Sequence, residues 1–298
     1  MDNRKYEALL TVAETGSITR AAEQMGYTQS GITQMIKSLE NELGVTLLTR
    51  TNRGVSLTNA ARELLPLMRD EQRADERIKQ QCAAFSGKTA GRITIGCLSS
   101  VSESWMPSVL ETLASRYPGI QVSMKEHETP MLLELLADGS LDLAICEITG
   151  ESTPLEVVKL HTDEIIAIVP QDHELAGRGS VTLQDLSGYP FISYTIGETS
   201  LGYPGWPEAI IKRKVRFNIA YSCKDNLTVI KMIDHRLGVS LASDLIMRNY
   251  ETSAARLHLD PPIYRDIGIV KRPAEKDLPA ASAFTSCLME FIKNEYHI

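Results

Sequence analysis

The stretch ITRAAEQMGYTQSGITQMIKSL, residues 18–39, decides the fold of the N-terminal part of this chain. Its pattern predicts two short helices joined by a tight turn. Ser17 stands where an N-cap of the first helix is needed, and Gly26 follows that helix where a left-handed residue is needed. Thr28 then caps a second helix, whose apolar residues recur along one face at spacings of four, three and four: Ile32, Ile36, Leu39 and Leu43.

The opposite face of the second helix is polar and carries Gln29, Ser30, Thr33, Gln34 and Lys37. Together with the cap residue Thr28, these side chains offer the donors and acceptors that read base edges in a major groove. A solvated face of an ordinary helical hairpin has a similar composition, so that alternative stays open at this point. The pattern favours a helix-turn-helix whose second helix contacts DNA.

Two short strands are predicted next, at residues 46–49 and 55–57. The turn between them contains Asn and Gly, which suit a tight turn. Arg50 and Arg53 lie in this turn, where a hairpin wing would bring them to phosphates or into a minor groove. An ordinary solvated turn is the alternative, and the adjacent helix pair favours the wing.

Residues 12–58, VAETGSITRAAEQMGYTQSGITQMIKSLENELGVTLLTRTNRGVSLT, resemble the winged helix-turn-helix of LysR-type transcriptional regulators. The Ala-Ala pair, the Gln-Ser start of the second helix and the Leu-Thr that closes the wing all match. Leu9 and Leu48 stand where phenylalanine is usual, and Ala61 where glycine is usual. Thr33 replaces a usual serine on the reading face, so the expected target sequence differs while the expected fold does not.

The formal charge of −7 is unevenly distributed. Residues 1–62 carry seven Lys or Arg against six Asp or Glu, residues 63–87 carry four against five, and the rest of the chain holds the remaining −7. A near-neutral N-terminal part excludes a strongly basic, non-specific DNA binder. We expect affinity for double-stranded DNA to come from locally placed cations and from two copies acting together.

Several other classes of protein are disfavoured. The five cysteines are scattered and lack a C-x-x-C pair, so neither a disulfide framework nor a zinc site is expected. No catalytic motif, phosphate loop or paired metal ligands appear, so we expect no enzyme activity, cofactor or metal. The charged N-terminus is not a signal peptide, and no apolar run is long enough to span a membrane. The expected location is therefore the cytoplasm.

A long helix is predicted over residues 58–85, with Ala61, Leu64, Leu65, Met68, Ile78, Cys82 and Phe85 roughly along one side. This stripe favours pairing with a second copy, although packing against the chain's own C-terminal part is the alternative. Pro66 is expected to kink the helix or remove a backbone hydrogen bond. The resemblance implies a dimerising linker helix over residues 59–87, with a hinge at its end, after a DNA-binding domain at residues 1–58. It also implies a homodimer or homotetramer.

From residue 88 onward, predicted strands alternate with predicted helices, which favours parallel sheets covered by helices. The strands are expected at residues 93–97, 120–125, 141–146, 165–169, 190–194, 216–221, 238–241 and 267–270, and the helices at 105–117, 131–137, 226–235 and 278–296. This α/β part resembles the LysR-type effector-binding domain, which is two-lobed and like a periplasmic binding protein. We expect lobe I at about 88–162 and 267–298, and lobe II at about 163–266.

Ligands of open α/β sheets bind beyond the carboxyl ends of the strands. This rule selects Ser99, Ser100, Thr129, Thr195 and Tyr203 as candidate effector-binding residues. The serines precede a helix N-terminus, whose free amides could hold an anion, although a serine there could equally be a simple helix cap. The predicted effector is a small carboxylate or a neutral metabolite.

The chain is therefore expected to be a ligand-responsive, DNA-binding transcriptional regulator of the LysR type. Two alternatives from other classes are a small-molecule-binding module and an enzyme that uses a cleft serine or cysteine, and neither explains residues 18–57. A thiol-sensing regulator is a third, because Cys97, Cys146 and Cys223 fall at strand carboxyl ends. Free cysteine is also a common buried apolar residue, and no cationic partner is near these cysteines in the sequence.

Overall fold

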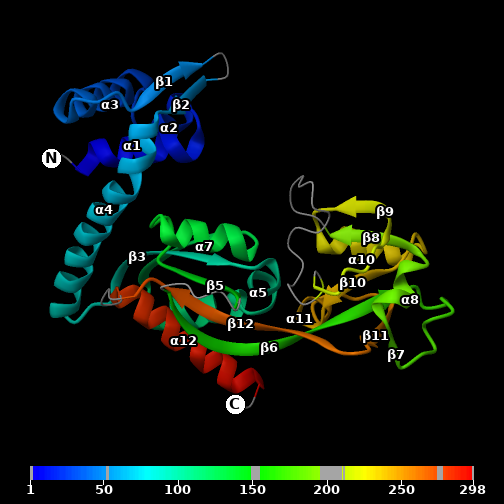
Figure 1. Ribbon diagram of the computed structural model, residues 1–298. Helices are drawn as coiled ribbons and strands as arrows, with labels where there is room; N and C mark the ends of the chain where they lie inside the picture. The colour runs from blue at the N-terminus through cyan, green and yellow to red at the C-terminus, as the bar shows by residue number, and fades with distance from the viewer. Residues whose placement is uncertain are drawn as a thin grey trace.

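The computed structural model describes residues 3–51, 54–148, 155–194, 210, 212–273 and 278–296. Three parts follow one another along the chain: a small helical N-terminal part, one long helix, and an α/β part with two lobes (Figure 1). This arrangement confirms the predicted fold class. None of the described helices combines the length and apolar character needed to cross a membrane.

The N-terminal part is a winged helix-turn-helix. Its elements are α1 (Asn3–Thr15), α2 (Ile18–Met25), α3 (Gln29–Leu43), β1 (Leu48–Thr51) and β2 (Gly54–Leu57). The strands of the wing are antiparallel, and β1 begins two residues later than predicted. Two groups of buried residues hold these elements together, one between α1, α2 and α3 and one that also includes the start of the long helix.

The predicted helix caps are confirmed. Ser17 accepts a hydrogen bond from the backbone N–H of Arg20 at 3.4 Å, and Thr28 accepts one from Gly31 at 3.1 Å. Gly26 ends α2 with a φ of 71°, in the left-handed region that costs glycine little. These three residues fix the angle at which α3 leaves α2.

The long helix α4 (Asn59–Phe85) is capped by Thr58 and continues through Pro66. Its apolar stripe is divided between two environments. Ala61, Leu65 and Met68 are buried in the N-terminal core, whereas Ile78, Cys82 and Phe85 are exposed. One half of the predicted stripe therefore belongs to the N-terminal core, and the other half faces solvent. The segment predicted as a hinge forms a hydrogen-bonded turn, in which Lys88 donates to the carbonyl of Ala83.

The α/β part contains further helices and strands. The helices are α5 (Ser99–Ser104), α6 (Met106–Arg116), α7 (Thr129–Ala137), α8 (Leu183–Ser187), α10 (Asn226–Asp234), α11 (Asp244–Met247) and α12 (Pro279–Tyr296). The strands are β3 (Ala90–Cys97), β4 (Gly119–Glu126), β5 (Leu143–Glu147), β6 (Glu156–Val169), β7 (Ser180–Val181), β8 (Pro190–Tyr194), β9 (Asn218–Cys223), β10 (Ser240–Ser243), β11 (Ala255–Leu259) and β12 (Ile263–Lys271).

The sheets are mixed, so the prediction of parallel sheets is correct for some strand pairs and wrong for others. In the described part of the chain, one sheet has the order β4-β3-β5-β12-β6-β11-β7, with β10 also paired to β6. The pairs β3–β4, β3–β5 and β8–β9 are parallel, whereas β12 and β6 are antiparallel to each other. The physical reason is that β6 carries the chain from one lobe to the other and β12 carries it back.

These two crossing strands join the lobes (Figure 1). A core of residues from β3, β5, α6 and α12 fills one lobe. In the other lobe, alternate residues of β6 face two separate cores: Ile165 and Ala167 face one, and Ile166 and Ile168 face the other. Because both crossing strands run through the predicted lobe boundary near residue 162, the lobes share a continuous sheet. The exact domain limits stay a prediction.

Candidate DNA-contacting face and inter-lobe cavity

The outer face of α3 is open to solvent. Gln29, Ser30, Gln34 and Lys37 are exposed, while Ile32, Ile36 and Leu39 of the same helix are buried. This division comes from the helical period, which places the two sets on opposite sides. The amides and the ammonium on this face are therefore free to meet a groove and its phosphates.

Two predicted DNA-contacting residues, Thr28 and Thr33, also form hydrogen bonds within the protein. The hydroxyl of Thr28 caps α3, and the hydroxyl of Thr33 donates to the carbonyl of Gln29 at 2.8 Å. Arg50 belongs to β1, where its backbone pairs with Val55. The side chain of Arg50, and the whole of Arg53, lie outside the described residues.

A cavity lies between the two lobes, with a volume of about 80 Å³. One water needs roughly 10–15 Å³ of such space, so the cavity has room for a small organic molecule. Elements of both lobes supply its lining: Leu98, Ser99, Ser100, Glu128, Ile165, Tyr194, Ile210, Asn226, Leu241, Ala242, Ser243, Ile246 and Arg265.

A buried ion pair forms one side of this cavity. The guanidinium of Arg265 contacts the carboxylate of Asp163 at 2.8 Å, and these side chains are 11% and 1% exposed. Asp163 also accepts hydrogen bonds from Ser243 Oγ at 2.6 Å and from the backbone N–H of Leu245 at 3.0 Å. Arg265 donates to Ser100 Oγ at 2.9 Å. The network thus joins β12 and β6 to α5 and α11.

Glu128 is the second carboxylate of the cavity region. Burial raises the pKa of Glu128 to about 7, Arg265 opposes the shift, and Glu147 adds to it. Burial also raises the pKa of Tyr194, while the neighbouring Ser99 hydroxyl opposes that shift. The two groups give the cavity one acid near its titration point and one neutral phenol at pH 7.

Of the predicted effector-binding residues, the structure brings Ser99 and Ser100 together in the cavity lining. Thr129 is not among the lining residues: it is buried, and its hydroxyl accepts a hydrogen bond from the backbone N–H of Glu147 at 3.2 Å. Thr195 and Tyr203 lie outside the described residues.

Sequence reasoning missed Glu128, Asn226, Ser243 and Arg265. The rule that selects loops after strands also selects Asn226, which follows β9, and Glu128 immediately precedes the predicted Thr129. Arg265 lies inside β12, two residues before the strand predicted at 267–270, so no loop rule finds it.

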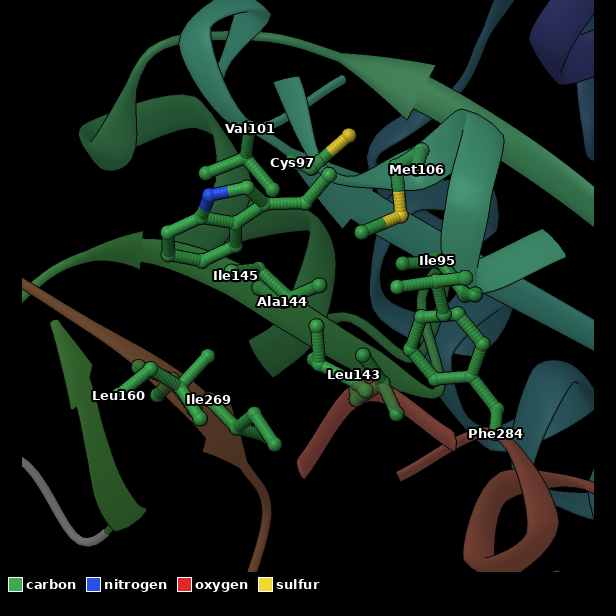
Figure 2. Close-up of a cluster of buried hydrophobic side chains, with 14 of the residues drawn as sticks. Ile95, Cys97, Val101, Met106, Leu143, Ala144, Ile145, Leu160, Ile269 and Phe284 are labelled. Atoms are coloured by element: carbon green, nitrogen blue, oxygen red, sulfur yellow. The ribbon is translucent and has the colours of Figure 1, made fainter. Parts of the chain in front are cut away.

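The cysteines are separate from this cavity lining. Cys97 and Cys146 are fully buried, and burial raises the pKa of each thiol to about 12. Figure 2 shows Cys97 within the apolar core, near Val101 and Met106. Thiolates are the reactive form, so this environment disfavours oxidation at these two positions. All five cysteines are free thiols, and no group of His, Cys, Asp and Glu within the described ranges is suited to hold a metal ion.

Two family models match this chain. The model described as "Bacterial regulatory helix-turn-helix protein, lysR family" matches residues 3–62. The model described as "LysR substrate binding domain" matches residues 86–293. The two matched ranges correspond to the winged helix-turn-helix and to the α/β part.

Similar proteins cover nearly the whole chain. The HTH-type transcriptional regulator YvbU of Bacillus subtilis is 27% identical over 98% of this chain and 99% of that protein. A protein from Mycobacterium avium named as a probable hydrogen peroxide-inducible genes activator is 26% identical over 98% of this chain and 94% of that protein.

Solved structures share the fold. Full-length OxyR from Pseudomonas aeruginosa has a TM-score of 0.73 at 20% identity, covering 98% of this chain and 95% of that one. Full-length CbnR in complex with its target DNA has a TM-score of 0.65 at 19% identity, covering 98% of this chain and 100% of that one.

Proposed function

This chain belongs to the LysR family of bacterial transcriptional regulators, and we propose that the inter-lobe cavity binds the small-molecule effector that controls its action on DNA. The chain is a ligand-responsive, DNA-binding regulator. Its place of action is the cytoplasm, where bacterial DNA lies. The outer face of α3, with Gln29, Gln34 and Lys37, is the proposed base-reading surface, and the wing arginines are the proposed backbone contacts.

The effector site is supported by the fact that residues of both lobes line the cavity. Ser99 and Ser100 come from α5 in one lobe, while Asn226 comes from α10 in the other. A molecule that touches both lobes binds one relative placement of the lobes better than another. A ligand shifts a conformational equilibrium only by such a difference in affinity. The cavity therefore has the arrangement that a switch requires.

The connection to DNA runs through α4. This helix is tied to the first lobe by ion pairs from Arg69 to Asp138 at 2.9 Å and from Arg73 to Asp142 at 3.2 Å. We infer that the first lobe and α4 move together, and that the second lobe moves relative to them when effector binds. Such a movement changes the spacing of two paired DNA-binding parts.

Pairing of two copies is proposed through the exposed side of α4. Leu67, Ile78 and Phe85 are 63%, 64% and 83% exposed, and their spacings of eleven and seven residues place them on one side of the helix. Large apolar side chains exposed along one side of a helix are typical of a surface that pairs with another chain. The ion pairs to the first lobe use another side of α4, so attachment to the chain's own lobe and dimerisation are compatible.

The test uses full-length protein and DNA selected from a random pool. Footprints on the selected site are recorded with and without a panel of small metabolites. We expect one compound to change the footprint, and we expect Ser99→Trp, which fills the cavity, to abolish that response while DNA binding persists. Ser108→Trp, at an exposed position of α6, is the control. An effector response that survives Ser99→Trp places the effector elsewhere.

A thiol trigger is the second candidate, because relatives are named as hydrogen peroxide-inducible genes activators. The burial of Cys97 and Cys146 argues against those two cysteines as its sensors. Cys82 is exposed on α4, beside the proposed dimer surface. Footprints with added hydrogen peroxide, for the chain and for Cys82→Ser, separate this candidate from the effector.

A further inference from the structure

We propose that the effector carries an ammonium or guanidinium group, and that the carboxylate of Glu128 is its anchor. This inference rests on the proposed function of the cavity and names the chemical class of the molecule bound there. It arises from the balance of charge around the cavity.

The single cation in the described lining is already neutralised. Arg265 makes an ion pair with Asp163 and donates a further hydrogen bond to Ser100. Asp163, in turn, is held by Ser243 and by the backbone of Leu245. The ion pair is almost fully buried, so its two charges compensate each other at short range. A ligand anion would have to compete with Asp163 for the guanidinium.

Glu128, by contrast, feels the charge of Arg265 but makes no ion pair with it. It stands immediately before α7 and lines the cavity, and within the described ranges its side chain has no hydrogen bond or ion pair. Buried or half-buried carboxylates normally have a partner, because leaving a charge without one is costly. Burial raises the pKa of this carboxyl to about 7 despite the positive charge of Arg265 on β12, and Glu147 on β5 adds to the shift. A cationic donor in the cavity would remove the cost.

The other lining residues indicate the chemical character of the effector. Leu98, Ile165, Leu241 and Ile246 offer apolar walls, while Tyr194 and Asn226 offer neutral polar groups. Apolar walls with a few placed polar groups are the usual construction of a small-molecule site. The volume of about 80 Å³ has room for a small organic molecule. A short alkyl amine fits this construction better than the carboxylate considered from the sequence, because Glu128 would repel a carboxylate.

The test compares three probes of equal length: n-butylammonium, n-butanol and butyrate. Binding to the full-length chain is measured by calorimetry at pH 8, where Glu128 is ionised. We expect n-butylammonium to bind at least about tenfold more tightly than the other two probes. A hydrogen bond to a charged group contributes enough free energy for a difference of this size. Glu128→Gln should remove that advantage and leave the affinity for n-butanol within about twofold.

The control variant is Glu134→Gln, which removes an exposed carboxylate from the same helix and should change nothing. Tighter binding of butyrate, equal binding of all three probes, no binding of the amine, or an amine affinity unaffected by Glu128→Gln overturns the proposal. Failure of the cavity as effector site has a different signature. In that case n-butylammonium binds with the same affinity to Ser99→Trp as to the unsubstituted chain.

Discussion

The side-chain oxygen of Gln80 accepts a hydrogen bond from the backbone N–H of Ala280 at 3.1 Å, across 200 residues of sequence. The amide nitrogen of Gln80 donates to the carbonyl of Arg92 at 2.9 Å. Gln80 is 1% exposed, so one side chain of α4 bonds the backbone of the first lobe at two places, in β3 and at the start of α12. This contact and the ion pairs of Arg69 and Arg73 attach the linker helix to the effector-binding part.

Replacing Gln80 by leucine should therefore destabilise the chain. The substitution keeps the volume but leaves the N–H of Ala280 and the carbonyl of Arg92 without partners. Each such buried group costs about 1–3 kcal/mol. We expect urea unfolding to show a loss in this range or above, together with a weaker effector response of the DNA footprint. Gln81→Leu, at the exposed neighbouring position, is the control. Equal stability of the two variants would show that Gln80 does not hold the helix to the lobe.

The outer face of α3 gives a second prediction. Gln29→Ala or Gln34→Ala should relax the preference for the selected DNA sequence, because an amide that reads a base edge discriminates by about 1–3 kcal/mol. Lys37→Ala should weaken binding to all sequences alike and reduce the salt dependence by about one phosphate contact. Fluorescence anisotropy at several salt concentrations measures both effects. Unchanged selectivity of both glutamine variants would reject the base-reading roles.

The exposed side of α4 gives a third prediction. Ile78→Glu should raise the dimer dissociation constant by tenfold or more, since burying one isoleucine side chain is worth about 1.5–3 kcal/mol. Sedimentation velocity over a range of concentrations measures the constant. Gln81→Glu adds the same charge at a nearby exposed position and should have a smaller effect. A dimer that is indifferent to Ile78→Glu assembles through another surface.

Local signals in the sequence predict the N-terminal part well. The helix ends there are set by Ser17, Gly26 and Thr28, each of which bonds to residues only a few positions away along the chain. Their roles can therefore be predicted from helix capping alone. The same holds for β8, whose predicted limits match the observed ones. Short elements such as β7 and α11 were missed because they carry too few residues to show a period.

The cavity could be predicted only in part, because its main polar groups meet through tertiary structure. Ser99 and Ser100 follow a strand that the sequence shows clearly. Arg265 and Asp163 come from two long antiparallel strands, whose pairing across the lobes leaves no local pattern. The mixed sheet was missed for the same reason, since strand direction depends on the path of the chain between the lobes.

The buried ion pair gives a fourth prediction. Asp163→Asn should cost about 3–5 kcal/mol of folding free energy, because Arg265 would remain buried without its counter-ion. Asp163→Asn combined with Arg265→Met should recover part of that loss, since the uncompensated charge is then removed. Urea unfolding of the single and double variants measures the coupling. Additive losses would show that the two side chains act independently.

The pKa of Glu128 gives a fifth prediction, for stability as a function of pH. Its value of about 7 in the folded chain lies above its ordinary value of 4.5. Between these values the folded state binds more protons than the unfolded state, so this group lowers the free energy of unfolding as pH rises from 4.5 to 7. Its contribution becomes constant about one pH unit above 7, and its full size is about 3 kcal/mol, at about 1.4 kcal/mol per pKa unit.

Glu128→Gln should therefore gain stability relative to the unsubstituted chain as pH is raised, because glutamine does not titrate. Urea unfolding at pH 5 and pH 8 measures the difference in unfolding free energy between the variant and the unsubstituted chain at each pH. The change in this difference between the two pH values is due to Glu128, because all other titrating groups are shared. Glu134→Gln, which removes an exposed carboxylate from the same helix, is the control. A bound ammonium compound should reduce the pH dependence of the unsubstituted chain, because it stabilises the ionised carboxylate in the folded state. Stability profiles of Glu128→Gln and the unsubstituted chain that run parallel between pH 5 and pH 8 would contradict a raised pKa at this position.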